Sequence, residues 1–99
     1  MKTIDELVVL IDKWHDDRLI VPNSTPAIQA LKMFSEAGEL ADNIIKGRDV
    51  KDDIGDVIVC LCAVARLSGT TIQECMTQAY LDIASRGGTT LKNGTFVKE

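Results

Sequence analysis

Two pairs of acidic residues have the spacing of a metal site. Glu36 and Glu39 form one pair, and Asp53 and Asp56 form the other, on either side of an expected helix break at Gly47. Residues three apart lie on one face of a helix, so each pair directs its carboxylates the same way. A chain reversal near Gly47 would bring Glu39 level with Asp56. Four converging carboxylates repel one another unless a cation lies between them, so the spacing favours a divalent-metal site.

The second pair precedes a strongly apolar helix. Residues 57–65 read VIVCLCAVA, which is apolar on every helical face and typical of a helix packed on all sides. We therefore expect Asp53 and Asp56 to point inward, where a carboxylate must protonate, pair with a base or bind metal. The face of Glu36 and Glu39 also carries other polar residues, and on its own it would equally fit a solvated stripe.

Composition narrows the class of protein. Ninety-nine residues with 45% hydrophobic content are expected to form one domain, 1–99. A net charge of -4 argues against binding to a nucleic-acid backbone, and the apolar run of nine residues is too short to span a bilayer. The odd set of Cys60, Cys62 and Cys75 indicates reduced thiols in helix interiors. We expect a soluble, cytoplasmic protein with neither nucleic-acid nor membrane partners.

Helical periodicity and capping signals predict an all-α fold of four helices with a terminal hairpin. The capping-box pairs are Thr3 with Glu6 and Thr71 with Glu74, and Thr25 is the expected N-cap of the second helix. The segment 22–26 is expected to be a turn-rich connection. The helices are predicted from Ile4 to near Arg18, from about Pro26 to Lys46, from an N-cap at Asp49 to about Leu67, and from Ile72 to the stop at Gly87 and Gly88.

The tail predicts a β-hairpin. Segments 89–92 and 95–98 flank Asn93 and Gly94, a strong signal for a type I′ turn that would place Leu91 opposite Phe96. Because an isolated hairpin is marginally stable, we expect it to pack on the helices or on another subunit.

Several side chains have a predicted environment. The second helix is expected to bury Leu31, Phe34, Ala37, Ala41 and Ile45. The third helix has more apolar surface than three modest helices can cover, so the protein is expected to be an oligomer. Among the remaining side chains, Trp14 could pack in the core or stack on a nucleobase, His15 is expected at a solvated helix end, and Tyr80 is expected in the core with its hydroxyl at the rim.

The acidic motifs resemble those of a known family. Residues 35–40 read SEAGEL and residues 53–57 read DIGDV. Together they resemble the paired signature of the MazG-like nucleotide pyrophosphohydrolases, within the all-α NTP pyrophosphatase superfamily. The resemblance is close over 29–66, and the tail 86–97 is similar to small phage and prophage members. It implies a four-helix bundle-like fold with a C-terminal hairpin, completed by oligomerisation as a homodimer or homotetramer.

The resemblance also implies an activity. The family splits a nucleoside triphosphate, NTP or dNTP, into the monophosphate and pyrophosphate, with Mg²⁺ as the cofactor and Mn²⁺ as a substitute. No residue defines the base, so a narrower substrate such as dUTP, dCTP or phosphoribosyl-ATP is equally compatible. The alternative is a non-catalytic helical oligomerisation or regulatory module that retains an acidic metal site.

Eight residues are expected to form the site. The resemblance implies Glu36, Glu39, Asp53 and Asp56 as metal ligands. Glu39 is also the expected catalytic base because it lies centrally between the two pairs, and the expected substrate-binding residues are Lys32, Gln29, Trp14 and Arg86. Two positions depart from the family pattern. Asp53 stands where glutamate is usual, and Asp52 beside it could be the ligand instead, while Ser35 stands where a further glutamate is frequent. Lys32 could contact phosphate or pair with Glu36 one turn away.

Overall fold

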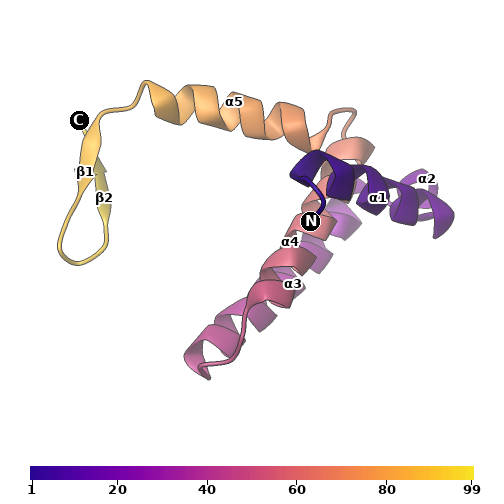
Figure 1. Cartoon of the computed structure of the whole chain (residues 1–99), viewed down its shortest axis with the longest axis horizontal. Coiled ribbons are helices and arrows are strands. Elements are labelled where there is room, and N and C mark those ends of the chain that lie inside the picture. Colours follow the sequence, from indigo (N-terminus) through magenta and orange to yellow (C-terminus); the bar gives the residue numbers. More distant parts are fainter.

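The computed structural model describes residues 1–99 and confirms an all-α fold with a short C-terminal hairpin (Figure 1). The four predicted helices are present and a fifth, very short one joins the first two. The elements are α1 Ile4–Asp17, α2 Ile20–Asn23, α3 Pro26–Ile45, α4 Lys51–Leu67, α5 Ile72–Ala84, β1 Gly88–Thr90 and β2 Phe96–Lys98. No single helix is long and apolar enough to cross a membrane; only α4 and α5 taken together pass that test of length and composition.

Helix α2 lies in the segment expected to be a connecting turn. The chain enters it through Leu19, whose φ of 60° makes it the one non-glycine residue with a left-handed backbone. Pro22 is tolerated here because the N–H groups of a first helical turn have no intrahelical partner. The composition of 22–26 is typical of turns, but α2 packs against both α1 and α4, and this tertiary contact overrides the local preference.

The predicted N-caps are largely confirmed. Thr3 and Glu6 form a complete capping box at α1, and the Thr25 hydroxyl accepts from the backbone of α3. At α5, Thr71 accepts from the backbone N–H of Glu74, but the Glu74 side chain accepts from the hydroxyl of Thr70 at 2.8 Å. The second half of that predicted capping box is therefore wrong.

A tight reversal at Gly47 folds α4 back along α3. Gly47 has a φ of +68°, its N–H donates to the carbonyl of Ile44, and the N–H of Arg48 donates to the carbonyl of Asn43. These two bonds form a Schellman motif, which satisfies the last carbonyls of α3. Helix α4 begins one residue later than predicted, with Val50 at its N-cap, although the Asp49 carboxylate still accepts from the N–H of Lys51.

Helix α4 is the centre of the fold. It packs against α1, α2, α3 and α5, whereas α3 packs against α4 alone. The buried apolar residues are accordingly few and mostly belong to α4: Val8, Cys60, Cys62, Ala63 and Ala65. Ile54, Ile58 and Leu61 of α4 remain exposed, so the expectation that this helix is covered on every side is not met within one chain.

Other predicted core residues lie at the surface. Leu31, Phe34, Ala41 and Ile45 of α3 are exposed, and only Ala37 is half-buried, because their side of α3 faces away from its single neighbour. Cys75 and Tyr80 are likewise exposed, since α5 packs against the end of α4 alone. The thiols of Cys60 and Cys62 are buried as predicted.

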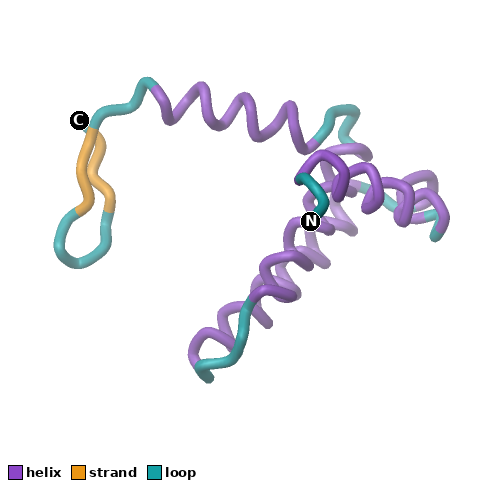
Figure 2. The backbone as a smooth tube through the Cα atoms, in the orientation of Figure 1, coloured by secondary structure: helices purple, strands orange, loops and turns teal.

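The C-terminal part of the chain projects from the other helices. Helix α5 leaves α4 at an angle of 100°, and the hairpin beyond it contacts no helix (Figure 2). The predicted hairpin register is wrong: Thr90 pairs with Phe96, and Leu91 with Thr95. A type I′ turn needs positive φ at both central residues, but only Gly94 has it, so the loop holds three residues, 92–94.

Candidate active site

One cavity gathers five of the eight predicted site residues. It has a volume of about 130 Å³ and lies where α1, α2, α3 and α4 meet. Trp14, Gln29, Lys32, Glu36 and Asp56 all line it. The remainder of its lining is His15, Ile20, Val59 and Cys60. Carboxylates from both acidic motifs therefore line one cavity together with the ammonium group of Lys32 and the indole ring of Trp14.

The first acidic pair borders this cavity through one member. Glu36 is half-buried and lines the cavity, whereas Glu39 is exposed and does not. Desolvation, followed by the neighbouring Glu39 carboxylate, raises the pKa of Glu36; Lys32 acts in the opposite direction. Lys32 forms no ion pair with Glu36 in this structure, so its ammonium group is available to a ligand.

The second acidic pair points inward, as predicted. Asp53 is buried, and its Oδ2 accepts a 2.8 Å hydrogen bond from the side-chain amide of Asn43 on α3. Asp56 is half-buried and has no ion-pair partner. Desolvation, then the charges of Asp52, Glu36 and Asp53, raise the pKa of Asp56. The carboxylates of α3 and α4 are therefore close enough to oppose one another's ionisation.

The donor atoms suit a hard divalent cation, since all are carboxylate oxygens. No three histidine, cysteine, aspartate or glutamate side chains are gathered closely enough in this structure to hold a metal ion. The four-ligand set of Glu36, Glu39, Asp53 and Asp56 therefore stays a prediction. Asp52 stays an alternative to Asp53, because it is exposed and neighbours Asp56 along an apolar groove between α1 and α4.

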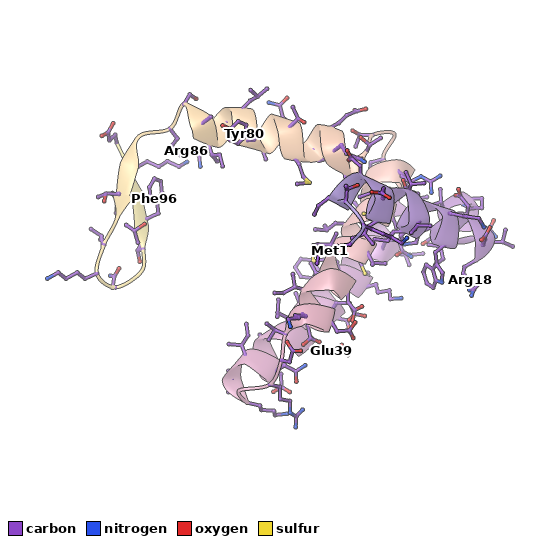
Figure 3. The ribbon with its side chains drawn as sticks, viewed as in Figure 1. Met1, Arg18, Glu39, Tyr80, Arg86 and Phe96 are labelled. Carbon is purple, nitrogen blue, oxygen red and sulfur yellow. The ribbon has the colours of Figure 1, made fainter.

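Arg86 lies apart from the other predicted site residues. It follows α5, near the hairpin, while Glu39 lies on the α3 and α4 pair (Figure 3). Within a single chain Arg86 does not join the cavity.

His15 is a site residue that the sequence prediction missed. It was expected at a solvated helix end, but only 1% of its surface is exposed, because α2 folds over that end of α1. Its Nδ1 has no hydrogen-bond partner, and burial lowers its pKa. A helical signal for this was present: His15 follows the buried Val8 by seven residues and so lies on the same face of α1.

Trp14 is half-exposed at the mouth of the cavity and is not a core residue. Its ring meets that of His15 edge-on with centroids 5.5 Å apart, and the guanidinium of Arg18 lies 5.7 Å from the indole centroid. Because Trp14 lines the cavity and is 44% exposed, part of its indole ring is accessible to a planar ligand.

Arg66 holds α1 in place beside the cavity. Its Nη1 donates to the backbone carbonyl of Asp12 at 3.1 Å and contacts Oδ1 of Asp16 at 2.9 Å. These contacts join α4 to the last turns of α1, which carry Trp14 and His15. Arg66 is therefore a positioning residue for the aromatic side of the cavity.

Comparison with known proteins gives a relative by sequence and neighbours among the solved structures. No protein-family profile matches the chain. An uncharacterized 18.2 kDa protein from the rep-hol intergenic region of Haemophilus phage HP1 is 35% identical over 68 residues, which cover 67% of this chain and 42% of that protein. The chain thus spans less than half the length of this relative.

One structural neighbour is a cyanophage S-2L MazG-like pyrophosphohydrolase, solved with dGDP and three catalytic Mn²⁺ ions per active site. The similarity covers 100% of this chain and 94% of the neighbour, with a TM-score of 0.71 and 24% sequence identity. The fold expected from the two acidic motifs is therefore confirmed: this chain has the fold of a MazG-like pyrophosphohydrolase.

Proposed function

We propose that this protein hydrolyses nucleoside triphosphates, NTP or dNTP, to the monophosphate and pyrophosphate with Mg²⁺, for which Mn²⁺ can substitute. The observation that carries the proposal is the cavity shared by Glu36 and Asp56 with Lys32 and Trp14. It offers carboxylates for a cation, an ammonium group for phosphate and an indole for a nucleobase. A nucleoside triphosphate bound to a divalent cation presents a ligand for each of these groups.

The acidic residues fit a bound cation by their chemistry. Glu36 and Asp56 each have a raised pKa, to which neighbouring carboxylates contribute. We propose that Glu36, Glu39, Asp53 and Asp56 hold the cation, with Asp52 as the alternative to Asp53. When bound, it would activate water and offset the negative charge of the triphosphate.

The other residues would orient the substrate and accept a proton. We propose that Lys32 contacts the phosphates and that Trp14 stacks on the nucleobase. The side-chain amide of Gln29 would form a hydrogen bond with the substrate. The oxygen of a water molecule attacks the α-phosphorus, the bond to the oxygen that bridges to the β-phosphorus breaks, and pyrophosphate leaves. Glu39 accepts the proton that the water loses. We also assign a contact with the phosphates of the substrate to Arg86.

The structural neighbour adds support for a nucleotide ligand. That enzyme was solved with dGDP and Mn²⁺, and its fold matches this chain over its full length. The proposal places the reaction in the cytoplasm, where nucleoside triphosphates are made and used. It also includes self-assembly as a homodimer or homotetramer, since Ile54, Ile58 and Leu61 of the central helix are exposed in one chain.

The second candidate is a non-catalytic oligomerisation or regulatory module with an acidic metal site. Two features of the sequence favour it. Ser35 occupies a position where the family frequently has glutamate, and Ser85 and Gly87 stand where related phage proteins tend to be basic. Such a module would bind a cation without releasing pyrophosphate, so metal binding alone does not distinguish the two candidates.

The distinguishing experiment is a substrate screen. The protein is incubated with common and modified NTPs and dNTPs, including dUTP and dCTP, and with phosphoribosyl-ATP, in Mg²⁺ or Mn²⁺, and monophosphate and pyrophosphate are quantified. Glu36→Gln is expected to lower pyrophosphate release by more than ~100-fold, because even an outer-shell partner of a metal contributes about 10–100-fold. Glu6→Gln is the matched control, since glutamine also completes a capping box. Absence of pyrophosphate with every nucleotide would favour the second candidate.

A further inference from the structure

His15 is a buried polar residue of the cavity to which the proposed function gives no role. Only 1% of its surface is exposed, and its side chain lines the cavity from the last turn of α1. Its Nδ1 has no hydrogen-bond partner. Because folded proteins pair the great majority of their buried polar atoms, an unpaired one beside a cavity points to a ligand.

The imidazole of His15 suits an uncharged ligand. Burial lowers its pKa, so the ring is mostly neutral at pH 7 and has one N–H donor and one acceptor nitrogen. Since no hydrogen bond engages Nδ1, the ring can rotate about its last torsion, which is broad in all imidazole side chains. A neutral donor and acceptor matches the edge of a nucleobase better than the charge of a phosphate.

His15 lies at the end of the cavity away from the acids. Gln29, Lys32 and Glu36 line the cavity from one face of α3, spread over about 10 Å of its axis. Helix α4 runs back along α3, so Asp56 lies beside Glu36 and the rest of α4 follows in the direction of Gln29. Helices α1 and α2 lie together at that end of the pair (Figure 1). The acids therefore mark the cation end of the cavity, and α1 and α2 border the opposite end.

This opposite end is mostly apolar. Most of its lining is aromatic, aliphatic or thiol, from Trp14, Ile20, Val59 and Cys60. Its polar side chains are His15 and Gln29. Gln29 is only 9% exposed, and its Nε2 donates to the hydroxyl of Ser24 at 3.0 Å, which fixes the direction of the amide. An apolar pocket with a few fixed polar groups is typical of a site that orients a planar ligand.

The volume of the cavity limits the size of that ligand. A cavity of about 150 Å³ accommodates one benzene molecule, which is a single six-membered ring. The whole cavity of this protein has a volume of about 130 Å³. It therefore has room for the single ring of a pyrimidine, whereas the two fused rings of a purine are too large.

We infer that His15 is a specificity-determining residue, which forms a hydrogen bond, together with Gln29, to the edge of a pyrimidine base stacked on Trp14. Pyrimidine nucleotides are then preferred to purine nucleotides. The inference rests on the proposed binding of a nucleotide in this cavity and adds the class of its base. Cytosine and uracil both carry donors and acceptors on this edge, so the experiment includes both.

Trp14 provides a direct measurement of base binding. It is the only tryptophan of the chain, so its fluorescence reports a base that stacks on it. Dissociation constants are measured by titration with dCMP, dUMP, dAMP and dGMP in Mg²⁺, which requires no turnover. The wild type is expected to bind dCMP or dUMP at least ~10-fold more tightly than either purine nucleotide, because a pocket discriminates by this much on size alone.

Substitutions of His15 test its role. His15→Phe keeps a flat ring but removes both nitrogens, and it is expected to weaken pyrimidine binding by ~3–10-fold, the value of one neutral hydrogen bond. The ratio of pyrimidine to purine affinity should fall with it, whereas a merely structural defect would weaken all four nucleotides alike. His15→Gln restores a donor and an acceptor and should retain more of this ratio. Tyr80→Phe, at an exposed position outside the cavity, is the matched control and should keep it unchanged.

The outcomes separate this inference from the proposed hydrolysis. Pyrimidine binding without pyrophosphate release would support the inference and contradict the hydrolysis. Equal or tighter binding of purine nucleotides by the wild type, or no binding of any nucleotide, would overturn the inference, and neither result depends on a variant that folds. An unchanged affinity ratio in a helical His15→Phe protein would also overturn it.

Discussion

The side-chain amide of Asn43 donates a 2.8 Å hydrogen bond to Oδ2 of Asp53, joining α3 to the first turn of α4 beside the acidic residues. Asp53 is only 9% exposed and has no basic partner. Asn43 itself accepts a longer bond, 3.4 Å, from Arg48. The amide of Asn43 is therefore the group that compensates Asp53 for its lost solvation.

Replacing Asn43 with alanine is expected to destabilise the fold. Asn43→Ala leaves a buried carboxylate without its donor, which costs about 1–3 kcal/mol of unfolding free energy. Urea denaturation in EDTA measures this loss. Asn23→Ala, at an exposed position whose side chain makes no hydrogen bond, is the control and should change the free energy by less than ~0.5 kcal/mol. Equal effects of the two substitutions would contradict a specific role for Asn43.

Two ion pairs are expected to differ in their contribution to stability. The Arg66 side chain is 27% exposed and joins α4 to α1 through Asp12 and Asp16. Arg66→Ala should therefore lower the unfolding free energy by about 1 kcal/mol or more, although solvent screens part of the charge interaction. Lys13 pairs with Asp17 within α1, and both side chains are at least half-exposed. Lys13→Ala should therefore cost less than ~0.5 kcal/mol. Denaturant titrations that rank the pairs in the opposite order would contradict this.

The buried imidazole of His15 is expected to make stability depend on pH. Burial lowers its pKa, with Arg66 of α4 and Lys32 of α3 acting in the same direction and Asp12 and Asp16 of α1 opposing them. Between this lowered pKa and 6.5, the unfolded chain binds more protons than the folded chain, so stability falls as pH falls.

A comparison with His15→Gln isolates this contribution. The melting temperature of the wild type should drop between about pH 7.5 and pH 5.5, and that drop should be smaller in the variant. Burial also raises the pKa of Asp12, an effect that acts in the opposite direction at lower pH and persists in the variant, because the opposing charge of His15 is a smaller cause than burial. An identical pH dependence of the two melting temperatures would show that His15 does not contribute.

Local signals in the sequence predicted the helices well because they act within a few residues. The caps at Thr3 and Thr25 and the reversal at Gly47 satisfy backbone groups at helix ends, whatever the rest of the chain does. The apolar run at residues 57–65 likewise predicted an inward direction for Asp53, which is buried.

Burial was predicted less well, because it depends on which elements meet. His15 is covered only because Leu19 turns the chain back into α2, and no local signal predicts a left-handed leucine. Phe34 and Tyr80 are apolar residues at helical spacing and resemble core residues, yet in one chain no element reaches them. The location of Arg86 could not be predicted either, because it depends on the direction in which α5 leaves α4.

The replacement of Asp56 by asparagine separates a metal site from a structural ion pair. Asp56 has no basic partner in this structure, since Arg66 pairs with Asp16 and Lys32 forms no ion pair. Desolvation, and then the charges of Asp52, Glu36 and Asp53, oppose its ionisation. Removing the charge should therefore relieve repulsion, so Asp56→Asn is expected to melt in EDTA at a temperature at least equal to that of the wild type.

Added Mg²⁺ should raise the melting temperature of the wild type, because a ligand that binds only the folded state stabilises it, and should have little effect on Asp56→Asn. Pyrophosphate release should be largely lost in the same variant. Asp82→Asn, on exposed α5 and without an ion pair, is the control and should retain both responses. If the Asp56 carboxylate instead paired with a buried basic side chain, Asp56→Asn would leave that positive charge unpaired and would lower the melting temperature in EDTA. A clear drop of that kind, together with a wild type that does not respond to Mg²⁺, would exclude the metal site and the proposed hydrolysis with it.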